Sequence, residues 1–282
     1  MRRPAAVLLA LWFLAAAVAL LPLLTAGAGF STTVEDAAGQ RAQRWTALGW
    51  NSVRLALWAV AGALALAVPA AFALAELPPR LRGAAAALAA LPLFVPPGVV
   101  AVGATMLLGA GGVLTEFLRS GAARPGSEIA SAGWAADFAP VYTIAGAGLA
   151  TAAAYAPALL ACVLAGLRRA SREEEDAAFL DGGRRAVWLA VRLPAAAPWT
   201  ALGAALVFLL AVIEFSIPES LRALPVLAGD VYVQFGVRYD AAAALGAAGT
   251  LAALALAALL LAWPLLPRAL RASGEDAADA ER

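Results

Sequence analysis

The residues of this chain that could do chemistry are concentrated in one segment, 171–198, which reads SREEEDAAFLDGGRRAVWLAVRLPAAAP. A run of acidic residues, Glu173–Asp176, is followed by two alanines, a glycine pair and two arginines. Groups this densely charged are very costly in hydrocarbon, yet the segment lies between two long apolar runs. We therefore expect a water-exposed loop at one face of a membrane, with an order of residues that favours docking of a soluble partner.

The residue types missing from the chain exclude several kinds of catalytic site. All 20 basic residues are arginine, there is no histidine, and Cys162 is the single cysteine. A phosphate-binding P-loop needs its lysine, a Ser-His-Asp triad needs histidine, and zinc or haem sites usually need histidine or several cysteines. We therefore expect a protein that is not an enzyme, with no cofactor and no metal. No basic-aromatic patch suggests nucleic acid as a partner.

The composition is that of a membrane protein. The 282 residues are 63% hydrophobic and their mean hydropathy is +0.82, well above the values of soluble domains. About 20 apolar residues cross the hydrocarbon core of a bilayer, and such spans must be helical because each has to satisfy its own backbone polar groups. The sequence predicts an all-α polytopic membrane helical bundle with six transmembrane helices. The predicted spans are 5–27, 52–75, 84–109, 141–166, 198–218 and 241–265.

The arginines predict the orientation of the bundle. Placing the N- and C-termini in the cytoplasm puts most arginines in short inner loops, as the positive-inside rule requires. The domains expected are an N-terminal anchor helix with the first extracytoplasmic loop (1–50), a transmembrane domain (51–266) with a cytoplasmic loop at 167–197, and a cytoplasmic tail (267–282). The first span is read as a retained anchor, since its apolar run exceeds the roughly 7–15 residues of a signal peptide. Cleavage there would leave five spans.

Local signals in the charged segment predict a short helix, a sharp turn and a helix that returns to the membrane. Ser171 and Glu174 match the S-x-x-E capping box that starts a helix. The acidic residues of the first turn suit the positive end of the helix dipole. Gly182-Gly183 supplies a residue that can take the left-handed cap conformation. A second apolar stretch, 186–193, ends at Pro194.

The first helix of this segment offers a docking surface. Ala177 and Ala178 allow another surface to approach closely, while Phe179 and Leu180 can fill pockets in it. The alternative is a solvated loop whose alanines reflect an alanine-rich chain. The order of an acidic residue, two alanines, three residues and glycine, followed later by Leu-Pro, favours docking, because composition alone makes only the alanine pair common.

This order resembles the EAA signature of inner-membrane permeases of binding-protein-dependent ABC importers. That signature is Glu-Ala-Ala, three residues, Gly, nine residues, an apolar residue, one further residue and Leu-Pro. Residues 176–182 fit its first half with Asp176 in place of Glu, and Leu193-Pro194 fits its end with a spacer one residue shorter. Aligned from Pro194 instead, Glu175 takes the acidic position and the glycine falls out of register. One missing helical residue turns the rest of the helix by about 100°, so the placement of the second helix stays open.

The resemblance implies a type I importer permease in the bacterial inner membrane. Such a subunit forms the substrate pathway together with a second, identical or related permease subunit, and it works with an extracytoplasmic substrate-binding protein. Its loop places a coupling helix on cytoplasmic ABC ATPase subunits, which hydrolyse ATP in its stead. The residues implied to carry this coupling are Glu175, Asp176, Ala177, Ala178, Phe179, Leu180, Gly182, Leu193 and Pro194. The spans resemble most those of iron(III), thiamine and polyamine-type systems, which leaves the cargo open. A secondary transporter and a non-transporting membrane scaffold are the alternatives.

Three further residues are candidates for the pathway. Pro96 and Pro97 lie inside the third predicted span, where proline kinks a helix; they form either a hinge lining the pathway or a fixed packing kink. Glu214 lies near the outer end of the fifth predicted span. An acidic side chain at membrane depth is a functional candidate, and the alternative is a carboxylate that reaches water at the interface. Pro218 is expected to end this span.

Overall fold

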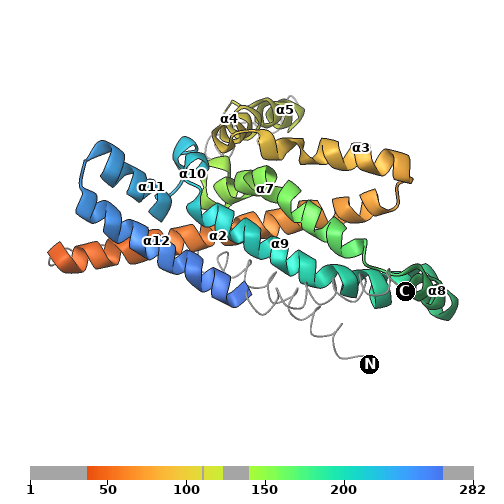
Figure 1. The fold of residues 1–282 in the computed structure, drawn as a ribbon. Coiled ribbons are helices and arrows are strands. Elements are labelled where there is room, and N and C mark those ends of the chain that lie inside the picture. The colour runs from red at the N-terminus through yellow and green to blue at the C-terminus, as the bar shows by residue number, and fades with distance from the viewer. Residues whose placement is uncertain (1–36, 110, 123–139, 263–282) are drawn as a thin grey trace.

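The computed structural model describes residues 37–109, 111–122 and 140–262, and every regular element in these ranges is helical (Figure 1). Four long helices form the bundle: α2 (Ala37–Ala75), α7 (Ile144–Leu167), α9 (Leu193–Ile213) and α12 (Ala241–Ala262). Helix α7 packs against α2 and α9, and α12 packs against α9 and α2. The first predicted span, 5–27, and both termini lie outside the described residues.

Helix α2 is much longer than the span predicted from it. Its 39 residues extend over about 58 Å at a rise of 1.5 Å per residue, nearly twice the roughly 30 Å of a hydrocarbon core. The segment before Asn51 is helical because it is rich in alanine, glutamine and arginine, which favour helix. The helix ends at Ala75 because Leu77 precedes Pro78, and a residue before proline avoids the helical conformation.

The third predicted span, 84–109, is wrong as a single helix. Helix α3 (Pro79–Ala90) leads into a 3-10 turn, η1 (Leu91–Phe94), and α4 (Pro97–Leu108) begins only after two further residues. Val95 is extended, with φ −81° and ψ 125°, because it precedes a proline. Pro97 then opens α4 at a position where a missing amide hydrogen costs nothing. The two prolines therefore separate two helices instead of kinking one, and Figure 1 shows α4 turned away from the line of α3. A short helix, α5 (Val113–Ala122), comes next.

The centre of the bundle is packed with small residues on α2 and α7. The buried alanines of α2 recur every three or four residues and form one stripe: Ala56, Ala59, Ala63, Ala67 and Ala71. Gly148 of α7 faces the same helix so closely that a Cβ there would lie 2.4 Å from Trp58 Cβ and 3.0 Å from the Leu55 carbonyl oxygen. Small residues of this kind allow helix backbones to approach each other in a membrane. Helices α2 and α7 are therefore the framework on which the other elements are placed.

The charged segment folds as predicted up to its glycine pair. Helix α8 (Arg172–Ala186) begins after Ser171, whose hydroxyl accepts a hydrogen bond of 3.1 Å from the Glu174 amide, which confirms the predicted cap. The helix is interrupted at Gly182, with φ −166° and ψ 21°, and at Gly183, with φ 65° and ψ −158°. The turn therefore lies at the predicted glycine pair. Gly183 has a positive φ, but its ψ differs from that of the predicted left-handed cap.

A wide helical turn carries the chain from α8 into α9. The π-helical turn η4 (Val187–Arg192) continues directly into α9. Pro194 lacks an amide hydrogen and cannot donate to the carbonyl group four residues earlier, and the wider turn lies directly before it. Pro198 lies inside α9, so this helix starts earlier than the predicted span at 198.

The far end of the bundle is built from short elements that pack on α2. Helix α9 ends at Ile213, and Pro218, predicted to end the span, lies instead within the short helix α10 (Ser216–Ser220). Helix α11 (Leu227–Tyr232) and the π-helical turn η5 (Val233–Val237) lead to α12. Ser52 of α2 holds this region, because its hydroxyl accepts a hydrogen bond of 2.9 Å from the Leu227 amide.

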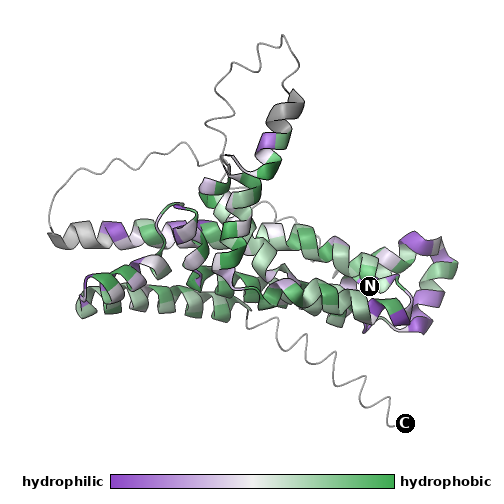
Figure 2. Ribbon diagram, turned by 90° about the horizontal axis from the view of Figure 1, so that it is seen from above, coloured by the Kyte–Doolittle hydropathy of each residue, from purple (hydrophilic) through white to green (hydrophobic). Residues whose placement is uncertain are grey.

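Five segments built from the described helices are long and apolar enough to cross a membrane, and one of them runs from α4 into α5. They are Gln43–Ala75, Pro97–Phe117, Ile144–Leu167, Arg172–Ile213 and Ala241–Ala262. Figure 2 shows hydrophobic residues along the length of the bundle and hydrophilic ones gathered at the end formed by α8, which we call the α8 end. The prediction of an all-helical fold with several helices long and apolar enough to span a membrane is thereby confirmed for the described residues.

Candidate functional site

Helix α8 presents an apolar pair on an otherwise charged surface. The helix has no buried residue, and the Phe179 and Leu180 side chains are 59% and 87% exposed. Of the other predicted docking residues, Asp176 and Ala177 are exposed and Ala178 is half-buried. Two large apolar side chains held in the open on a polar helix suit contact with another protein better than contact with water.

The predicted residue Glu175 belongs to an ion-pair cluster that joins α8 to α2. Arg192 donates from Nε to Glu175 Oε1 at 2.8 Å and from Nη2 to Glu175 Oε2 at 3.2 Å. Its Nη1 forms a further ion pair with Glu76, the residue directly after α2. Arg184 of α8 also contacts Glu76, from Nη2 to Oε2 at 2.8 Å. One arginine thus holds two carboxylates that come from two different helical elements.

An aromatic contact runs beside these ion pairs. The guanidinium of Arg192 lies 5.0 Å from the ring centroid of Trp188 in the same π-helical turn. The Trp188 ring meets Phe72 of α2 edge-on, with centroids 4.7 Å apart and an interplanar angle of 60°. Cation–π and edge-to-face aromatic contacts are both attractive. The turn η4 is therefore attached to the end of α2 through apolar as well as charged groups.

Against the effect of burial, the two arginines of this cluster lower the pKa of Glu76. Burial alone raises the pKa of a carboxyl group, but the hydrogen bond from Arg192, together with the positive charges of Arg192 and Arg184, holds the pKa of Glu76 below its ordinary value. The carboxylate is thus ionised at neutral pH and available to both arginines.

The remaining residues predicted for coupling lie at the turn and at the start of α9. Gly182 begins the interruption of α8, Leu193 is the first residue of α9, and Pro194 is the second. They lie along the same continuous path from α8 into the bundle but make none of the ion pairs described above. The structure therefore places all the residues predicted for coupling at the α8 end, where Glu76 and Arg192 also lie.

Glu214 is buried rather than exposed to water at an interface. The residue is 7% exposed, and its Oε2 accepts a hydrogen bond of 2.6 Å from the Tyr155 hydroxyl of α7. Its Oε1 accepts bonds from the Ser216 hydroxyl and from the Ser216 and Ile217 amides, the last two at 2.8 and 3.3 Å. The interpretation that this carboxylate reaches water is wrong. Its contacts join the end of α9 to α7 and to the start of α10.

The predicted pathway prolines lie in the region of the same short helix. Helix α4, which begins at Pro97, packs against α10, and a Cβ added at Gly98 would lie 4.0 Å from Ser216 Cβ. Pro96 caps the start of α4 and is exposed. The candidate pathway residues Pro96, Pro97 and Glu214 are thus brought into one neighbourhood, at the end of α9 opposite to the coupling residues Leu193 and Pro194.

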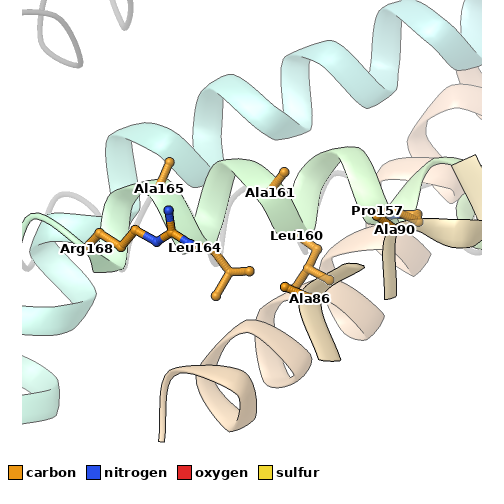
Figure 3. Close-up of a pocket in the computed structure, with 8 residues that line it drawn as sticks. All are labelled: Ala86, Ala90, Pro157, Leu160, Ala161, Leu164, Ala165 and Arg168. Carbon is orange, nitrogen blue, oxygen red and sulfur yellow. The ribbon is translucent and has the colours of Figure 1, made fainter. Parts of the chain in front are cut away.

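A separate apolar pocket of about 230 Å³ lies between α3 and α7 (Figure 3). Alanine, leucine and proline side chains line it, with Arg168 at one end as the single charged side chain. Its lining residues are Ala86, Ala90, Pro157, Leu160, Ala161, Leu164, Ala165 and Arg168. Such a lining lacks the converging polar groups of a catalytic site. The pocket contains none of the predicted site residues.

Sequence reasoning missed three residues of the α8 end, Glu76, Trp188 and Arg192, and it named the glycine pair without singling out Gly183. One signal was present for Arg192, since it is a lone charge in the apolar stretch 186–193, and a charge in such a stretch needs a partner. No local signal identified its partner Glu76, which lies 116 positions away. The requirement for glycine at residue 183 depends on its φ of 65°, which the glycine pair alone does not assign to one of its members.

Within the described ranges, no three histidine, cysteine, aspartate or glutamate side chains are grouped in a way that could hold a metal ion. The α8 end combines a set of ion pairs with an exposed apolar pair. No protein-family model matches the chain, and no curated protein is similar enough to count as a relative.

Proposed function

We propose that this chain is the transmembrane permease subunit of an ABC importer and that α8 docks onto a separate cytoplasmic ATPase. The observation that carries the proposal is the exposed pair Phe179 and Leu180 on a helix that has no buried residue. In a docked state these side chains fill pockets of the partner, and the burial of large apolar anchors is what stabilises such interfaces most.

Several features of the described residues support this proposal. Helix α8 lies at one end of a bundle of apolar helices, and its sequence has the acidic-Ala-Ala-x-x-x-Gly order of the coupling loop in such permeases. In the proposed topology six helices cross a bacterial inner membrane, and the α8 end and both termini lie in the cytoplasm. A second permease subunit completes the pathway, and an extracytoplasmic binding protein delivers the cargo.

The proposal is tested by recovering the ATPase with the chain. The tagged protein is solubilised from membranes of its own cells, and the bound proteins are identified by mass spectrometry and assayed for ATP hydrolysis. We expect a P-loop ATPase with the unaltered chain and its loss with the double variant Phe179→Ser, Leu180→Ser. The control is Leu245→Ser on α12, because Leu245 is also highly exposed, at 74%, but belongs to another helix.

Failure to recover an ATPase with the unaltered chain contradicts the proposal. A secondary transporter and a membrane scaffold both predict that outcome. Retention of the ATPase by the double variant contradicts the assignment of α8 as the docking helix.

A further inference from the structure

Helix α8 contacts the bundle through ion pairs and has no buried face. It has 15 residues, none of them buried, and among the described elements it packs mainly against η4. The ion pairs that join it to the described part of the bundle converge on Glu76 and Arg192. A helix without a buried face gains little from the hydrophobic effect, so these charged contacts contribute to its placement, beside the aromatic contact that attaches η4 to α2.

Of the two arginines, Arg192 holds its carboxylate partners more firmly than Arg184 does. Its side chain is 19% exposed, whereas that of Arg184 is 72% exposed, and exposed ion pairs are weakened by water and salt. Arg192 also binds both oxygens of Glu175 through two of its nitrogens, a fork geometry that fixes direction as well as distance. Arg184 contacts one oxygen of Glu76 through one nitrogen.

The position of Arg192 connects three elements. It lies at the end of η4, one residue before α9, and it binds Glu175 of α8 and Glu76 at the end of α2. Any displacement of Glu175 therefore acts on Arg192 and through it on Glu76. The turn at Gly182 and Gly183 lies between Glu175 and Arg192 along the chain, so the covalent connection bends there and the ion pair spans the bend.

We propose that Arg192 is a positioning residue that transmits movement of α8 to the end of α2. The proposal rests on the proposed function for the origin of the movement, because a docked ATPase would move α8. The mechanical link itself does not depend on the identity of the partner. The two can therefore fail independently.

The link is measured by distances in the purified chain, reconstituted in lipid nanodiscs. Spin labels are attached to cysteines at residues 73 of α2 and 179 of α8, both exposed, in a Cys162→Ser background. We expect one narrow distance distribution in the parent protein and its loss in Arg192→Gln. Arg192→Lys keeps the charge but lacks the fork, so partial recovery of the narrow distribution is expected.

Two comparisons separate the link from a general loss of structure. Glu76→Gln also broadens the distribution, and its combination with Arg192→Gln adds less than the sum of the two single changes, because both remove the same contact. Arg80→Gln is the matched control: Arg80 is an exposed arginine of α3, directly after the proline that opens it, and its replacement leaves the distribution narrow. An unchanged distribution in Arg192→Gln overturns the proposal, as does full additivity of the two changes.

The second arm uses the complex with the ATPase. In Arg192→Gln we expect the ATPase to stay bound and to hydrolyse ATP, while uptake of cargo into proteoliposomes is lost. A purely structural role would instead lower ATPase binding and uptake together, which would overturn the inference. If no ATPase is recovered with the parent chain, the proposed function fails, and the distance measurement still decides whether Arg192 links α8 to α2.

Discussion

The Tyr155 hydroxyl donates a hydrogen bond of 2.6 Å to Glu214 Oε2, joining the middle of α7 to the end of α9. The carboxylate is 7% exposed, and its other oxygen accepts bonds at the start of α10. A buried carboxylate needs such donors because it has lost its water. The contact therefore stabilises the junction of three helices.

Replacing Tyr155 with phenylalanine should destabilise this junction. The change removes one donor to a charged group and leaves the carboxylate buried, which costs about 1.5–3 kcal/mol. The midpoint of thermal unfolding in detergent should fall. Tyr239→Phe serves as control, because Tyr239 is 85% exposed. An equal midpoint for Tyr155→Phe and the parent protein would show that the hydrogen bond contributes nothing measurable.

Replacing Gly183 with alanine should distort the turn of α8 more than the same change at Gly182. Gly183 has φ 65° and ψ −158°, a region that residues with a Cβ enter only at a cost of about 1–3 kcal/mol. Gly182 is extended, and a Cβ there would lie 3.0 Å from Ala186 Cβ, a neighbour that has to give by a few tenths of an ångström. Hydrogen exchange of residues 184–192 should quicken more in Gly183→Ala. The reverse order would contradict this assignment of the glycine requirement.

Replacing Gly148 with alanine should push α7 away from α2. The added Cβ would lie 2.4 Å from Trp58 Cβ and 3.0 Å from the Leu55 carbonyl oxygen, and the backbone of a packed helix cannot yield as a flexible side chain can. Overpacking of this kind costs about 1–3 kcal/mol. Thermal unfolding in detergent measures the effect. Gly249→Ala on α12 is the matched control, since nothing lies within 4 Å of its added Cβ, and a similar loss in both variants would refute the close approach.

Acid should weaken the link between α2 and α8. Burial alone would raise the pKa of Glu76. The hydrogen bond and charge of Arg192, with the charge of Arg184, outweigh burial and lower this pKa from its ordinary 4.5. A lowered carboxyl pKa contributes stability that is present above the ordinary value and is lost as the pH falls through the folded-state value. The narrow distance between residues 73 and 179 should therefore persist at pH 4.5 and above and broaden at lower pH.

The control for this pH dependence is Glu76→Gln, which removes the titrating group. The acid transition assigned to Glu76 should be absent from that variant, although other carboxylates of α8 can still titrate. A Glu76-dependent transition with its midpoint above the ordinary pKa of 4.5 would contradict the direction of the shift.

Features set by neighbouring residues were predictable from the sequence. The cap of α8 depends on Ser171 and an amide three residues later, so the capping-box pattern was enough to predict it. The apolar lengths of α7 and α12 likewise predicted those helices, since a span needs only a continuous apolar run.

Features set by distant partners were not predictable in the same way, and hydropathy alone was misleading before Pro96. The residues on both sides of the break are apolar, so they were read as one span, although the chain between α3 and α4 is a 3-10 turn followed by the extended residue Val95. The burial of Glu214 depends on Tyr155, which is 59 positions away. The cluster at Arg192 likewise depends on Glu76, which belongs to a different part of the chain.

The single long helix α2 connects the contacts around Leu227 with those at Glu76. Asn51 and Ser52 bind the segment around Leu227 through hydrogen bonds to its backbone, and Glu76 lies just past the other end of the same helix. The stretch of α2 between Ser52 and Glu76 covers about 36 Å at a rise of about 1.5 Å per residue, so a tilt of about 5° at Glu76 displaces Ser52 by about 3 Å. A small rotation imposed beside Glu76 therefore arrives at Ser52 as a sideways step about as long as a hydrogen bond, enough to exchange one set of partners there for another.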